Sequence, residues 1–199
     1  MIDRFVGAWW LGGGAKYRAS ANWYWRTWNR PLSEALTKHD IRIAHATTLQ
    51  QVVDAFAGKV RWTPDLLSQL WDTIKPPIVL LNERGDDCDG SAMLWAQAVE
   101  YALGILGYRA RIVSYLADPF ALSHHVCIVQ HPTGELQAIQ PPPSAAQDPA
   151  TNPLIERYFK TYEQAAVEVA SWYPDAKRVQ GYDVRSASWG VVEKWKWLT

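Results

Sequence analysis

The feature that most constrains the fold is a helical run that is apolar on nearly every side. Residues 88–106 read CDGSAMLWAQAVEYALGIL, and beyond the first turn we expect only Gln97 and Glu100 to face solvent. Gly107 follows the run and suits the C-cap of a helix. Because a helix with apolar side chains all round must be surrounded by other elements, we expect it in the middle of the protein.

Three strand-like segments follow this helix. Residues 108–116 alternate basic and apolar side chains, residues 125–130 form an apolar run, and residues 135–140 return after a turn at 132–134. The order helix, strand, hairpin predicts an α+β fold in which the buried helix packs on an antiparallel sheet.

The flanking segments divide the chain around this core. Residues 1–46 form a tryptophan-rich N-terminal arm, residues 47–140 the core, and residues 141–199 a proline-rich linker with a C-terminal helical and strand extension. We expect all three to belong to one compact domain, since the chain has 199 residues of which 48% are hydrophobic.

Capping residues and prolines mark the shorter elements. Thr47 or Thr48 suits the N-cap of one helix, and Thr161 suits that of a C-terminal helix. Another helix is expected over residues 65–74, where two following prolines would end it. A short strand is expected near residues 178–184.

Charge and apolarity argue against several classes of protein. The 20 basic and 20 acidic residues cancel, which disfavours a nucleic-acid-binding protein or one that binds anionic membranes. No run approaches the ~18 apolar residues of a transmembrane segment. The apolar stretch at the N-terminus is short and interrupted, and an acid stands at Asp3, so we expect no signal peptide and a cytoplasmic or virion-associated protein.

Tryptophan is unusually frequent, with 12 residues. Those near the N-terminus either fasten the arm to the core or present an aromatic surface to a sugar, a lipid interface or a protein partner. Both interpretations stay open for this group, which comprises Trp9, Trp10, Trp23, Trp25 and Trp28.

Cys88 is the candidate nucleophile. A thiol attacks a carbonyl as the thiolate, which a helix N-terminus and an imidazolium partner both favour. Cys88 opens the buried helix, and His125 follows one strand later as the candidate base. His124 is the alternative, because neighbouring strand residues face opposite sides and only one can point at Cys88. We do not favour a disulfide, since Cys127 lies in an apolar run and suits a buried small hydrophobe.

A third group is needed to hold the imidazole by its other nitrogen. Gln140 closes the hairpin that His125 opens, so the two are expected to be near neighbours. An amide orients the ring but does not stabilise an imidazolium as a carboxylate would. Asp118 is the nearest carboxylate in sequence that the site could borrow.

The ordered set GDDCDGSA, GYRARIV, HVCIV and ELQAIQ resembles the core of transglutaminase-like cysteine peptidases. The resemblance covers residues 45–140 and implies a papain-like core with Cys88 as nucleophile and His125 as base. Two departures stand out: one extra residue lies between Gly85 and Cys88, and Gln140 stands where that family usually has Asp or Asn.

Several neighbouring residues are given supporting roles. The acidic cluster of Asp86, Asp87 and Asp89 is expected to cap the helix start, with one acid fixing the loop before it, which is a better interpretation than a metal site. Asp87 and Asp89 are the two given this supporting role. Trp62 and Trp95 are expected to contribute to substrate binding. We expect no metal and no cofactor.

The resemblance implies acyl transfer on an amide or peptide bond of a peptide or protein substrate. Hydrolysis is the favoured outcome, and protein cross-linking is the same chemistry with a lysine amine as acceptor. Two other interpretations stay open: a catalytically inactive scaffold in a larger assembly such as a phage virion, and a cell-wall hydrolase that acts on peptidoglycan.

Overall fold

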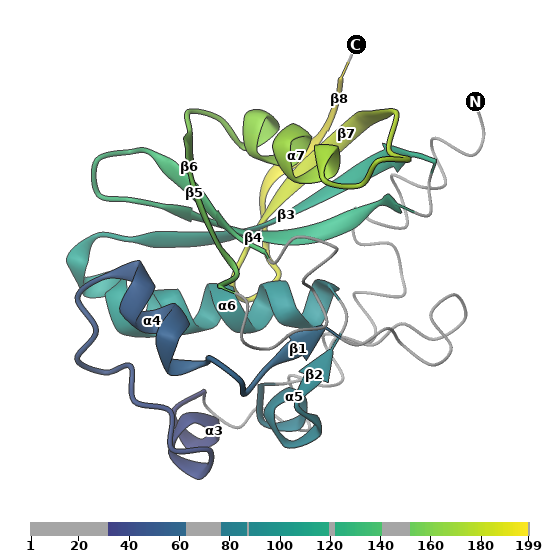
Figure 1. The fold of residues 1–199 in the computed structure, drawn as a ribbon. Coiled ribbons are helices and arrows are strands. Elements are labelled where there is room, and N and C mark those ends of the chain that lie inside the picture. Colours follow the sequence, from purple (N-terminus) through teal and green to yellow (C-terminus); the bar gives the residue numbers. More distant parts are fainter. Residues whose placement is uncertain (1–31, 63–76, 87, 120–121, 141–151, 199) are drawn as a thin grey trace.

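The computed structural model describes residues 32–62, 77–86, 88–119, 122–140 and 152–198. Their main feature is a six-stranded antiparallel sheet with helices on both faces (Figure 1), so the fold is α+β as predicted. The strand order is β6-β5-β4-β3-β7-β8. The bounds are β3 Arg109–Asp118, β4 His124–Gln130, β5 Leu136–Ile139, β6 Leu154–Phe159, β7 Arg178–Ser186 and β8 Val191–Trp197.

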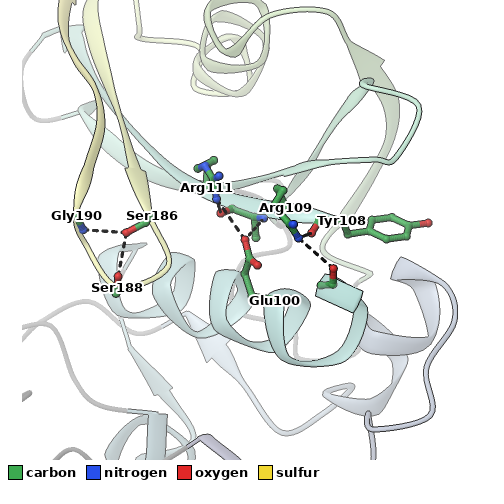
Figure 2. Close-up of polar contacts among 9 residues, drawn as sticks. Glu100, Tyr108, Arg109, Arg111, Ser186, Ser188 and Gly190 are labelled. Atoms are coloured by element: carbon green, nitrogen blue, oxygen red, sulfur yellow. Dashed lines mark hydrogen bonds and ion pairs between the residues drawn. The ribbon is translucent and has the colours of Figure 1, made fainter. Parts of the chain in front are cut away.

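The predicted central helix is α6, Cys88–Leu103, which is followed by a short 3-10 turn, Gly104–Leu106. It is buried along most of its length and lies against one face of the sheet (Figure 1). Glu100 ties the helix to the start of β3, because its carboxylate accepts from the backbone N–H of Ala110 at 2.9 Å and from Arg111 at 3.2 Å (Figure 2). Gly107 has a φ of 89°, which suits glycine and ends the helix as predicted.

The other face of the sheet is covered by α7, Tyr162–Ser171. Its N-cap is Thr161, as predicted, and the Thr161 side chain accepts from the backbone N–H of Gln164 at 3.1 Å. Small and branched apolar residues of α7 pack on the sheet in a second core cluster, and they include Ala165, Ala166, Val169 and Ala170.

Within the described ranges, three shorter helices and a two-stranded parallel sheet lie on the far side of α6 (Figure 1). Thr48 forms the predicted capping box with Gln51. Pro77 begins a helix where we expected prolines only to end one, since proline is well tolerated in the first helical turn. The helix predicted over residues 65–74 lies outside the described residues. The bounds are α3 Leu32–Lys38, α4 Leu49–Ala55, α5 Pro77–Glu83, β1 Arg61–Trp62 and β2 Gly85–Asp86.

The C-terminal segment is built into the same sheet. β7 pairs with β3 along most of its length, and β8 pairs with β7 at the edge. Strand β3 therefore lies between β4, which carries both candidate histidines, and β7. Side chains of the C-terminal segment thus lie next to the predicted site.

Candidate functional site

Cys88 is the first residue of α6 and is partly buried. The backbone N–H groups and the dipole of a helix N-terminus favour negative charge, so this position suits a thiolate. The other cysteine, Cys127, is a free thiol in the core, and burial followed by the charge of Glu100 raises its pKa far above the usual range. Cys127 is therefore suited to packing rather than chemistry.

Two tyrosines lie within electrostatic reach of Cys88. Burial and then the negative charge of Cys88 raise the pKa of Tyr173 to about 12. The pKa of Tyr115 is raised by burial, by Tyr173 and by Cys88. Tyr115 is the β3 partner of His124. The start of α6 therefore lies within electrostatic reach of the end of the sheet where β4 begins with its two histidines.

His125 is buried on the face of the sheet that α6 covers. Ile112 of β3 and Cys127 of β4 pack with α6 in one core cluster, and strand alternation puts Ser114 and His125 on the same side. Ser114 and His125 are direct partners across β3 and β4, and His125 Nδ1 lies 2.8 Å from Ser114 Oγ. The ring is thus held through Nδ1.

An ion pair on β7 lies next to Ser114 and His125. Asp183 is the direct partner of Ser114 across β3 and β7. Its Oδ2 accepts from Arg185 Nη2 at 2.7 Å, and the two side chains are only 2% and 3% exposed. Burial raises the pKa of Asp183, while the charge and hydrogen bond of Arg185 and the hydroxyl of Ser114 oppose that rise. A carboxylate therefore stands one serine away from His125.

Trp189, in the turn between β7 and β8, covers His125. The two rings have centroids 5.5 Å apart, and the guanidinium of Arg185 lies 5.6 Å from the Trp189 ring. Trp189 is itself buried. An indole in this position keeps water away from the imidazole and strengthens nearby electrostatic interactions.

His124 lies on the opposite face, which α7 covers. Its ring contacts the rings of Tyr115 and Tyr173, at centroid distances of 6.0 and 5.7 Å. Burial lowers the pKa of His124 to about 4, although an interaction with Gln140 opposes this shift. At neutral pH this histidine is uncharged, which makes it a poor partner for a thiolate.

The structure brings Gln140 to His124 and not to His125, contrary to our expectation. Cys127 pairs with Ile139, so Gln140 lies opposite Val126 and on the α7 face. A hairpin shifted by one residue would have put it on the other face. Asp118 is also not placed beside His125, because it lies four residues beyond Ser114 along β3, or about 13 Å.

The residues that were given supporting or substrate-binding roles are found in different environments. Asp89 is buried in the first turn of α6, and its Oδ1 accepts from the backbone N–H of Gly90 at 2.6 Å. The backbone of Trp62 pairs with Asp86, close in sequence to Cys88. Trp95 is 6% exposed and its ring packs edge-on against Phe56, so it belongs to the core and not to a surface that a substrate reaches. Asp87 lies outside the described residues.

Sequence reasoning missed four residues of the site: Ser114, Asp183, Arg185 and Trp189. A signal was present in residues 181–186, GYDVRS, where an acid and a base alternate with apolar side chains in a strand. Two opposite charges on the buried face of one strand indicate a buried ion pair. Without the strand order, their proximity to His125 was not visible.

No family model matches the chain, and no curated protein matches its sequence. Within the described ranges, no three His, Cys, Asp or Glu side chains gather as a metal site would require. No helix in that part of the chain is long and apolar enough to span a membrane.

Proposed function

We propose that the protein is a cysteine-dependent hydrolase that cleaves amide or peptide bonds through a covalent acyl-enzyme. Cys88 is the nucleophile and His125 is its base. The observation that carries the proposal is the position of His125 on the α6 face with Nδ1 against Ser114, while Cys88 opens α6. Nε2 is then the nitrogen that exchanges a proton with the thiol.

The reaction follows from these two groups. The Cys88 thiolate attacks the amide carbonyl and forms a carbon–sulfur bond, and backbone N–H groups at the start of α6 are suited to receive the oxyanion charge. The imidazolium of His125 gives its proton to the leaving amine as the carbon–nitrogen bond breaks. Water then attacks the thioester, His125 takes its proton, and the acid and the thiol are released.

The proposal also covers the group that accepts the acyl moiety and the class of substrate. A lysine amine in place of water would turn the same acyl-enzyme into a protein cross-linking transamidase. Peptides and proteins are the proposed substrates, and peptidoglycan cross-links are amides of the same kind. The five tryptophans of the N-terminal arm, where contacts to glycan or to a larger assembly would be expected, lie outside the described residues.

Alkylation of the folded protein with iodoacetamide between about pH 5 and 9 tests the nucleophile. The adducts are mapped by peptide mass spectrometry, and the buried Cys127 serves as the internal control. We expect Cys88 to react well below the pH at which a free thiol, with a pKa of about 8.5, becomes reactive. A Cys88 profile equal to that of a free thiol would refute the proposed site.

Incubation with a peptide pool in oxygen-labelled water tests the reaction itself. Hydrolysis places the label in new carboxyl groups, transamidation joins an added amine to the acyl product, and Cys88→Ala abolishes both. An activated thiol that yields neither product after long incubation would favour the scaffold interpretation.

A further inference from the structure

We propose that Ser114 and Asp183 are positioning residues that hold the His125 imidazole, so that the site takes its carboxylate from β7 rather than from the hairpin. This inference rests on the proposed function, since it assigns roles around the same nucleophile and base. It departs from the sequence expectation, which gave the orienting role to Gln140.

The strand register puts the three residues in one row. Ser114 is directly opposite His125 in β4 and directly opposite Asp183 in β7. Direct partners in antiparallel strands point to the same face with their Cβ atoms about 5 Å apart. The row therefore crosses three adjacent strands on the face that α6 covers, with Ser114 in the middle.

The donors and acceptors along the row are complementary. A serine hydroxyl has one hydrogen to donate and two lone pairs to accept with. We assign the Nδ1–H of His125 as donor to Ser114 Oγ, 2.8 Å away, and the Ser114 hydroxyl as donor to Asp183. Asp183 Oδ2 is taken by Arg185, while Oδ1 has no hydrogen-bond partner of standard geometry within the described part of the chain. This assignment leaves Nε2 as the basic nitrogen.

Arg185 keeps the carboxylate charged. Burial raises the pKa of Asp183, and the adjacent guanidinium opposes that effect. A buried ion pair loses much of its attraction to desolvation, so fold stability alone is a weak reason for one at this position. Arg185 Nε also has no hydrogen-bond partner among the described residues, which adds to the cost. Holding His125 gives this costly pair a function.

The turn between β7 and β8 places the Trp189 ring against His125 and Arg185. Trp189 has a φ of 65°, a left-handed conformation that is uncommon for a bulky side chain. The backbone N–H of Trp189 donates to the Ser186 carbonyl at 2.9 Å. The Ser186 hydroxyl accepts from the backbone N–H of Gly190 at 3.0 Å (Figure 2). The Gln97 side chain of α6 donates to the Ala187 carbonyl at 3.3 Å, which fastens the turn to the helix. The strained turn thus closes the site around His125 and Arg185.

Several titratable groups among the described residues bear on a pH experiment with Cys88 and His125. The Asp183–Arg185 pair of β7 lies on the α6 face, and Cys88 and Asp89 stand in the first turn of α6. Tyr115 and Tyr173 pack on His124, and the charge of Cys88 contributes to the rise of both their pKa values. Glu100 is paired with Arg111, and Glu193 is paired with Lys196 next to Tyr182.

The test compares Cys88 alkylation profiles of Ser114→Ala and Asp183→Asn with the unmodified protein. Ser114→Ala leaves the ion pair intact and removes only the bridge. We expect each variant to shift the Cys88 profile upward by about one pH unit, so that the rate near pH 6 falls about tenfold. Ser114→Thr, which keeps the hydroxyl, is expected to recover most of the rate. Ser171→Ala, in the exposed part of α7, is the matched control and is expected to leave the profile unchanged.

Gln140→Ala separates the two candidate orienting groups. We expect it to leave the Cys88 profile within about twofold of the unmodified protein, because Gln140 faces His124. A tenfold effect from Gln140→Ala, together with no effect from Ser114→Ala, would overturn the inference and restore the hairpin residue. If Cys88 is activated and depends on His125, but Asp183→Asn and Ser114→Ala match the unmodified profile, the inference fails and the proposed function stands.

A tautomer measurement needs no variant at all. Nitrogen NMR of the imidazoles, recorded after Cys88 is alkylated and above about pH 8, reports the neutral form of His125. We expect the proton on Nδ1. A proton on Nε2 would refute the assigned row, whether or not the substituted proteins fold.

Discussion

Two neighbouring histidines of β4 have opposite surroundings because a strand turns each successive side chain to the other face. His125 faces α6, with Ser114 on Nδ1, a carboxylate beyond it and an indole above. His124 faces α7, where two tyrosine rings and an amide surround it and burial lowers its pKa to about 4. One face carries the groups of the proposed site, and the other has a neutral histidine in a core.

The difference lies in which charges reach each ring. On the α6 face, the carboxylate of Asp183 lies next to Ser114 and favours an imidazolium, while the N-terminus of α6 favours a thiolate. The α7 face holds neutral hydroxyls and an amide, which hydrogen-bond a histidine without favouring its charge. Burial alone therefore does not distinguish the two histidines, because both are buried. The partners distinguish them.

The largest expected effect tests directly whether His125, and not His124, activates Cys88. His125→Gln removes the proposed base, so the Cys88 alkylation rate near pH 6 should fall by about 100-fold. His124→Gln is the matched variant on the next residue, and it should leave that rate within about threefold. Mass-spectrometric rates for the two proteins check the prediction. Equal losses would mean that the two faces are not separate, and a larger loss at position 124 would reverse the assignment.

A smaller effect concerns stability and comes from the α7 face. The pKa of His124 is lower in the folded protein, about 4, than its ordinary value of 6.5. The unfolded chain therefore binds the proton first, so the contribution of His124 to stability is complete above 6.5 and is lost as the pH falls toward 4. Between pH 7 and about pH 4.5, the unmodified protein should lose about 2 kcal/mol more than His124→Gln.

Urea unfolding at both pH values measures this difference. Asp183, whose raised pKa acts in the opposite direction, is present in both proteins and cancels in the comparison. The same pH-dependent loss in the two proteins would show that His124 is not buried in the neutral form.

The smallest effect compares the helices on the two sides of the sheet. Thr48→Ala and Thr161→Ala remove the N-caps of α4 and α7, and each should lower the free energy of unfolding by about 1 kcal/mol. Neither should change the Cys88 profile, because the polar row lies on the sheet. Chemical denaturation and alkylation of the same samples check both statements, and a selective change at Cys88 would show that a helix cap controls the site.

Much of the fold was predictable because local patterns are strong in this chain. The apolar run at residues 88–106, the cap at Thr161 and the turn near Gly134 each mark an element through its own residues. Errors arose where context decides. Pro77 starts a helix, and Trp95, given a substrate role, packs on Phe56 in the core.

For the candidate site, the sequence by itself determined the chemical types: a cysteine that opens a buried helix and two histidines that must face opposite ways. Tertiary structure decided which other side chains lie next to these residues. The one-residue register of the hairpin sends Gln140 to the α7 face, and the pairing of β7 with β3 brings Asp183 beside Ser114. Register and strand order depend on contacts between distant segments, whereas a motif reports only on its own neighbours. That is why the helix of Cys88 could be predicted and the carboxylate nearest His125 could not.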